Sequence, residues 1–132
     1  MSREGRTMMK SANAILAGLT LLGLASWVQA GALAADAETT FKFYCAQCHG
    51  LGGKGDGPNV TKNFPVSPRN FTNAKEMNKL SDADIKNVVL DGGPAASKSP
   101  MMPPWGKTLT GPQVDGLVKH LRKLCKCKGK QG

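Results

Sequence analysis

The sequence is poor in aromatic residues and shows no pattern typical of β-strands. Aromatic side chains make up 5% of the 132 residues, which limits the apolar surface that the chain can bury by itself. No stretch alternates apolar and polar residues as a half-buried strand does, and no internal repeat is present. The sequence therefore excludes a sheet-based fold and indicates a small helical protein that needs another source of apolar core.

A phosphate-binding loop is also missing, although residues 50–58 contain five glycines. No strand precedes these glycines, and the Gly-Lys-Ser/Thr ending of a phosphate-binding loop does not occur. We expect the glycines instead to let the backbone turn tightly after the motif described below.

The first 34 residues have the composition of a secretory signal peptide. Three basic residues lie within the first ten positions, residues 12–28 carry no charge, and Ala32-Leu33-Ala34 is a cleavage pattern of small residues. The alternative is an uncleaved helix that anchors the protein, since roughly 17 apolar residues can just span a bilayer. We predict a signal peptide over 1–34, one domain over 35–124, and a basic tail over 125–132.

The charge balance is strongly basic. The chain carries a formal +9, of which the first 34 residues contribute three basic side chains and one acid, so the remainder retains +7. A basic surface suits nucleic acid, an anionic membrane or an acidic protein. Nucleic acid does not fit an exported protein, and a membrane contact is expected only if the N-terminal segment is uncleaved.

The most informative stretch is Cys45-Ala46-Gln47-Cys48-His49. Two cysteines three positions apart, followed at once by histidine, form the C-x-x-C-H string to which one haem c is attached covalently. Both thiols can form thioethers with the haem, and His49 then lies under the iron as its proximal ligand. A thioredoxin-like dithiol, a plain disulfide, and a zinc site completed by Cys125 and Cys127 are the alternatives.

Periodicity predicts three helices, over 38–48, 82–91 and 111–124, with a weak extra turn near 72–77. Ser81 is the expected N-cap of the second helix, and Thr110 with Gln113 forms the expected capping box of the third. The apolar face of the third helix consists of Val114, Leu117, Val118, Leu121 and Leu124.

The iron needs a second ligand or an open position, and Met102 is the predicted ligand. It lies in the stretch Met102-Pro103-Pro104-Trp105, where prolines restrict the backbone and lower the entropy lost in holding one side chain toward the metal. A thioether ligand favours reduced iron and raises the reduction potential. Met101 is the second choice, and His120 is a rival that we expect to be a packing or surface residue.

With these stretches in view, residues 35–124 resemble a class I cytochrome c, a small monohaem bacterial electron carrier. The resemblance implies an all-α fold of three to four short helices and long loops wrapped around one haem. It further implies that Pro68 packs on the proximal side of the haem and that Trp105 contacts the cofactor. The Arg69 side chain is a predicted partner for a haem propionate, with a solvated arginine as the alternative. Cys125 and Cys127 are outside the family pattern, and we consider an exposed disulfide, a link to a partner, or no function.

The predicted function is electron transfer in the periplasm between redox proteins, with His49 and Met102 as iron ligands and no catalytic residue. The lysine-rich surface predicts an acidic docking face on the partner. Two alternatives remain open: a haem subunit tethered to a larger oxidoreductase, and a haem enzyme or gas sensor with an open iron position.

Overall fold

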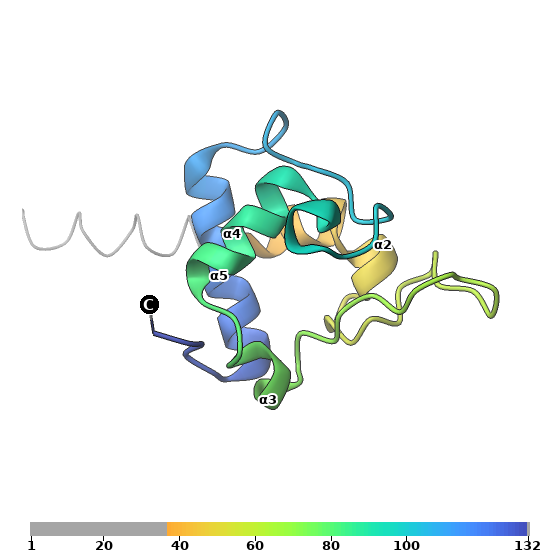
Figure 1. The fold of residues 1–132 in the computed structure, drawn as a ribbon, viewed down its shortest axis with the longest axis horizontal. Helices are drawn as coiled ribbons and strands as arrows, with labels where there is room; N and C mark the ends of the chain where they lie inside the picture. The colour runs from red at the N-terminus through yellow and green to blue at the C-terminus, as the bar shows by residue number, and fades with distance from the viewer. Residues whose placement is uncertain (1–36, 132) are drawn as a thin grey trace, which may run out of the picture. The chain divides into compact units, whose positions relative to one another are not determined.

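The computed structural model describes residues 37–131, and every regular element among them is helical (Figure 1). The predicted signal peptide at 1–34 lies outside the described residues. Within them, no helix is long and apolar enough to cross a membrane. Helical residues 37–44 come first, followed by α2 (Ala46–His49), α3 (Ala74–Met77), α4 (Asp82–Asp91), the 3-10 helix η1 (Gly93–Ala96) and α5 (Gly111–Cys125). The predicted all-α class is confirmed.

The two longer helices begin where their capping residues predict. The Ser81 backbone N–H donates to Asp84 Oδ2 at 2.8 Å, and the Asp84 N–H donates back to Ser81 Oγ at 3.1 Å, which closes a capping box on α4. At α5 the Thr110 N–H donates to Gln113 Oε1 at 2.9 Å. These contacts satisfy backbone groups that the first helical turn leaves without intrahelical partners.

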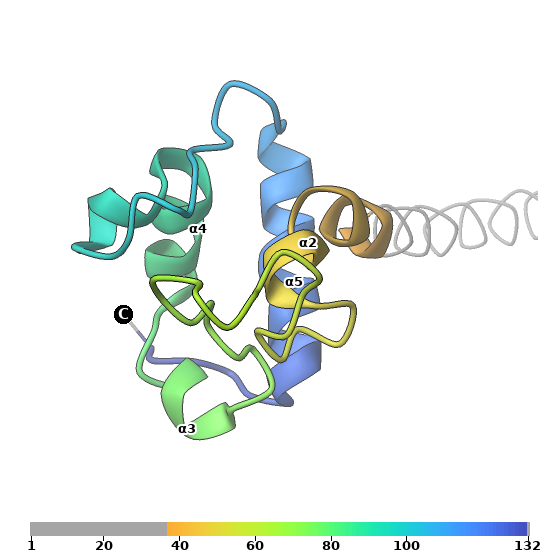
Figure 2. The same cartoon turned by 90° about the vertical axis from the view of Figure 1, so that its right-hand side faces the viewer.

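The core lies along α5. Val114, Leu117, Val118 and Leu121 are buried as predicted, whereas Leu124 is only partly buried and the next residue, Cys125, is buried in its place. Residues 37–44 cross α5 where the Phe41 and His120 rings meet with centroids 4.9 Å apart. The views in Figure 1 and Figure 2 show α4 beside α5, with the chain after η1 arching across their ends.

The C-terminal segment, which the sequence predicts only as a basic tail over 125–132, is tied to the domain. Cys125 and Cys127 form a disulfide, and Cys125 is only 4% exposed. Beyond it, the Gly129 N–H donates to Asn78 Oδ1 and the Lys130 N–H donates to the Leu80 carbonyl, both at 3.0 Å. Of the three alternatives considered for Cys125 and Cys127, the structure has the disulfide, but Cys125 is buried and Cys127 is partly buried. Helix α5 extends one residue past the predicted boundary.

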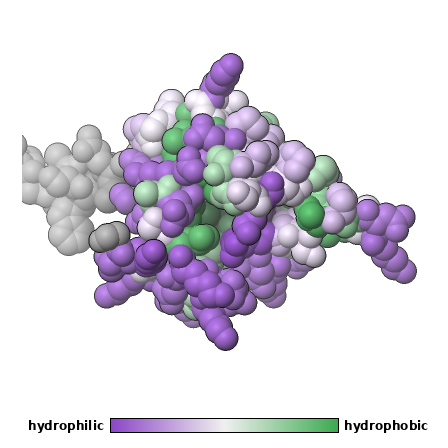
Figure 3. Space-filling view, in the orientation of Figure 1, coloured by the Kyte–Doolittle hydropathy of each residue, from purple (hydrophilic) through white to green (hydrophobic). Residues whose placement is uncertain are grey.

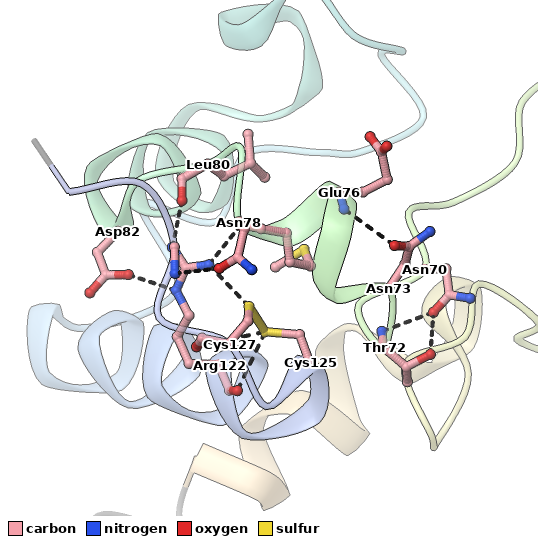
Figure 4. Close-up of a disulfide and its surroundings, with 12 residues drawn as sticks. Asn70, Thr72, Asn73, Glu76, Asn78, Leu80, Asp82, Arg122, Cys125 and Cys127 are labelled. Carbon is pink, nitrogen blue, oxygen red and sulfur yellow. Dashed lines mark hydrogen bonds and ion pairs between the residues drawn. A yellow bond between two sulfur atoms is a disulfide. The ribbon is translucent and has the colours of Figure 1, made fainter.

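Arg122 joins α5 to the connection between α3 and α4 (Figure 4). Its guanidinium donates to the Met77 carbonyl at 2.9 Å, to the Leu80 carbonyl at 2.7 Å and to Asp82 Oδ1 at 2.9 Å. The Arg122 side chain is 12% exposed. The Leu80 carbonyl also accepts from the Lys130 N–H at 3.0 Å, and the Met77 carbonyl accepts from the Leu80 N–H at 3.3 Å. Arg122 therefore adds a second, charged donor to each carbonyl and ties the start of α4 to α5.

We expect Arg122→Met to lower the free energy of unfolding by about 2–3 kcal/mol, because it removes three charge-assisted hydrogen bonds that join α5 to the start of α4. The measurement is denaturant unfolding of the holoprotein. Lys119→Met on the same helix is the matched control, since Lys119 is exposed and forms no ion pair with residues 37–131. Equal losses in the two variants would contradict the role assigned to Arg122.

Candidate functional site

Cys45, Cys48 and His49 lie on one short turn after helical residues 37–44. The helix is interrupted at Cys45, whose N–H still donates to the Phe41 carbonyl at 2.9 Å, and α2 continues from Ala46. The His49 N–H then donates to the Cys45 carbonyl at 2.9 Å. Both thiols are free and partly buried. The turn thus presents two thiols and an imidazole together, as attachment of one haem requires.

Cys45 does not have the character of a redox nucleophile, and the two thiols do not belong to a zinc site in the described residues. Burial, followed by the neighbouring Cys48, raises the pKa of Cys45 to about 12, so this thiol is protonated at neutral pH. A thioredoxin-like nucleophile needs the opposite shift. No group of three or more metal-binding His, Cys, Asp or Glu side chains is found within residues 37–131, and Cys125 and Cys127 are bonded to each other. The structure therefore does not support the zinc alternative.

The His49 imidazole is held in one orientation. Its Nδ1 lies 3.1 Å from the Arg69 carbonyl oxygen, and because a carbonyl can only accept, Nδ1 carries the proton. The ring also stacks on Phe71, with centroids 4.4 Å apart and planes inclined by 22°. Burial lowers the pKa of His49, although the hydrogen bond to the Arg69 carbonyl acts in the opposite direction. The lowered pKa favours the neutral ring. The unprotonated Nε2 remains available as an iron ligand.

The glycine-rich segment brings Arg69 to this position. The Gly55 N–H donates to the His49 carbonyl at 2.8 Å, and the Phe71 N–H donates to the Gly53 carbonyl at 2.6 Å. Gly55 has φ +83°, and a Cβ there would lie 2.5 Å from the Pro68 carbonyl oxygen. Only glycine permits both this conformation and this approach. The loop therefore packs the Pro68–Arg69 backbone directly against the attachment turn.

Arg69 contributes through its backbone, which the sequence reasoning did not anticipate. The prediction concerned its side chain and a propionate, and that pairing stays a prediction. In the described part of the chain the side chain forms no ion pair. Pro68 lies next to the carbonyl that orients His49, consistent with its expected place on the proximal side. Residue type does not indicate which backbone carbonyl accepts a hydrogen bond, so the adjacent Pro68 was the only sequence feature that pointed to this position.

The loop that contains Met102 is fastened to the end of α4. The Gly93 N–H donates to the Met102 carbonyl at 2.9 Å, and the Trp105 N–H donates to the Val89 carbonyl at 2.9 Å. A Cβ at Gly93 would lie 3.3 Å from Met102 Cβ and would clash with the Ser99 carbonyl oxygen, so the loop closes tightly over this glycine. Met102 is partly buried, whereas Met101 is 49% exposed. This difference favours Met102 over its neighbour as a ligand.

An aromatic contact links the two halves of the site. The Trp105 and Tyr44 rings meet edge to face, with centroids 5.1 Å apart. Tyr44 directly precedes Cys45, so Trp105 connects the Met102 loop to the attachment turn. His120 lies elsewhere: it contacts Phe41, which contacts Phe71, which stacks on His49. His120 is thus two rings away from His49 on the proximal side, which does not suit a ligand opposite His49.

The surroundings fit a haem. On the face seen in Figure 3, hydrophobic residues come to the surface in a central hollow ringed by hydrophilic ones. The two free thiols and the oriented imidazole supply the groups that covalent attachment and proximal ligation of a haem c use, and Met102 stays the predicted second ligand. Cys45, Cys48 and His49 would hold it from one side, and Met102 from the loop.

Comparison with known families agrees with this arrangement. A family described as "Cytochrome C oxidase, cbb3-type, subunit III" matches residues 32–121. No curated protein and no solved structure matches the chain significantly. The family match covers more than half of the chain and confirms both the resemblance to class I cytochromes c and the expectation of covalent haem c. The chain therefore belongs to the family of cbb3-type cytochrome c oxidase subunit III, as a class I c-type cytochrome that binds haem c.

Proposed function

We propose that this cytochrome is an exported electron-transfer protein whose iron is ligated by His49 and Met102. The observation that carries the proposal is the His49 ring, whose Nδ1 is bound to the Arg69 carbonyl while two free thiols lie on the same turn. A bound haem c would supply a one-electron iron couple. No residue of the site is assigned an acid–base or nucleophilic role.

The protein's part in such a reaction is to keep the ligands still. The Arg69 carbonyl and the Phe71 ring hold the His49 imidazole in place. Two backbone hydrogen bonds, from Gly93 to Met102 and from Trp105 to Val89, hold the loop that carries the thioether. Electron transfer is fastest when the ligand set changes little between oxidation states. Fixed ligands on both sides therefore support a carrier over an enzyme with an open iron position.

Oxidised and reduced visible spectra of wild type and Met102→Ala test the ligand assignment. We expect a low-spin wild type that does not bind carbon monoxide. Loss of the thioether should give a high-spin ferric protein that binds carbon monoxide stoichiometrically when reduced, and should lower the reduction potential. Met101→Ala is the matched control and should keep the wild-type spectrum. If Met102→Ala keeps it instead, the ligand is another residue; a wild type that binds carbon monoxide readily would support the open-site alternative.

Membership of an oxidase subunit family favours a second candidate, a haem subunit held in a larger complex. Mass spectrometry of the exported protein separates the two. A free carrier should lack about the first 34 residues and gain the mass of one haem. A full-length chain with haem that sediments with membranes would instead support the tethered subunit.

The basic surface should steer anionic redox partners to the protein. We expect the second-order rate of reduction of ferricyanide to fall about tenfold as ionic strength rises from low to physiological, because salt screens attraction between opposite charges. The matched control is tris(1,10-phenanthroline)cobalt(III), a cationic oxidant whose reaction should not slow with salt. Rates that respond equally for both reagents would contradict an acidic docking face on the partner.

A further inference from the structure

The end of α5 and the segment after it line a shallow, open groove of about 440 Å³ that is separate from the residues assigned to the haem. Its walls carry an unusual concentration of positive charge. We call it the basic groove, after four of its lining residues, Lys119, Lys123, Lys126 and Lys128. Three of these lysines lie on α5 or at its C-cap at a spacing of three to four residues, and the fourth follows the disulfide.

Within residues 37–131, two acids lie close enough to interact electrostatically with these lysines, Asp115 with Lys119 and Glu38 with Lys123. Each of these acids is ion-paired with a different lysine, Lys86 and Lys42 respectively. All four lysines of the groove are exposed, and none forms an ion pair with another residue between 37 and 131. Asp82 also lines the groove, but its carboxylate accepts from Arg122 Nε at 2.9 Å. Arg122 in turn is occupied by the Met77 and Leu80 carbonyls. The charge that remains open to solvent is that of the four ammonium groups.

The backbone that carries two of these lysines is held in place (Figure 4). Lys126 stands between the disulfide cysteines in a left-handed conformation with φ +50°, which a lysine rarely adopts. Cys125 anchors one side of this turn in the core. Lys128 lies between Cys127 and Gly129, whose N–H is bonded to Asn78. Repelling charges are thus kept near one another by a covalent bond and by the tied tail.

We propose that the basic groove binds an acidic segment of a partner protein, and that the Cys125–Cys127 disulfide presets the positions of Lys126 and Lys128 for it. Carboxylate side chains complement the ammonium groups, and binding to a preset backbone costs less ordering entropy. The proposal goes beyond electron transfer, because the groove contains none of the residues assigned to the haem.

A protein segment suits the groove better than a membrane surface. Peripheral membrane binding combines basic residues with apolar side chains that enter the bilayer. The large hydrophobic residues that are exposed, Phe43, Leu51, Val66 and Met101, do not line the groove.

Binding of fluorescein-labelled hexaglutamate to the holoprotein at low salt, followed by anisotropy, tests the proposal. Replacing Lys119, Lys123, Lys126 and Lys128 together with glutamine should weaken binding about tenfold or more. The matched control replaces Lys54, Lys62, Lys98 and Lys107, which are also exposed and without ion pairs, and should change the affinity less than about twofold.

Three outcomes would overturn the groove as the binding site. Equal weakening in the two quadruple variants would mean that only net charge matters. Absence of binding to wild type would reject an acidic ligand. Stronger binding to phosphatidylglycerol vesicles than to the peptide, lost only in the groove variant, would identify a membrane site instead. Each result leaves the visible spectrum unaffected, so it is distinguishable from failure of the haem assignment.

The role of the disulfide has its own test. Cys127→Ser keeps all four lysines and leaves Cys125 in the core, and we expect it to weaken hexaglutamate binding several-fold. Circular dichroism checks that the variant is folded, and Cys125→Ser/Cys127→Ser gives a second measurement without a free thiol. Wild-type affinity in both folded variants would show that the disulfide does not preset the groove.

Discussion

One hydrogen bond, from His49 Nδ1 to the Arg69 carbonyl, decides which nitrogen of the imidazole can face the cofactor. An imidazole free to rotate could direct either nitrogen toward the iron, and attachment of the haem through the cysteines alone would not select one of them. The bond requires the Arg69 carbonyl to reach a residue 20 positions away in the chain. The tight loop after His49, the absent side chain at Gly55 and the stacking of Phe71 all contribute to that approach.

The other side of the site is organised by the end of α4. Gly92 and Gly93 end the helix and receive the returning loop on their backbone, so that Met102 and Trp105 are bonded to residues of one helix terminus. Tyr44 then meets Trp105 from the attachment side. The described protein core contributes few aromatic residues, and several of those that exist pack around the site. This distribution agrees with a domain that completes its core with a bound haem.

Most of the elements could be predicted from the sequence because their causes are local. Ser81 and Thr110 mark helix starts by bonding to the residue three positions later, and the α5 face follows from spacing alone. The contribution of Arg69 could not be predicted, since every residue has a backbone carbonyl and the residue type does not show which carbonyl reaches His49. The attachment of the C-terminal segment to the domain was also not predicted. Its contacts, such as those of Arg122 with Leu80 and of Gly129 with Asn78, join segments more than 40 positions apart. In the sequence, the lysines and glycine of this segment resemble a solvated chain end.

The loop after the attachment turn is constrained at both ends but not in the middle. The Gly57 and Asn59 N–H groups donate to the Cys48 and Gln47 carbonyls, and at Pro68 the backbone returns to meet Gly55. Residues 61–67 between these points are mostly exposed. Differences in length among related chains should therefore accumulate within 61–67, whereas an insertion between His49 and Gly57 would move the Arg69 carbonyl away from the imidazole.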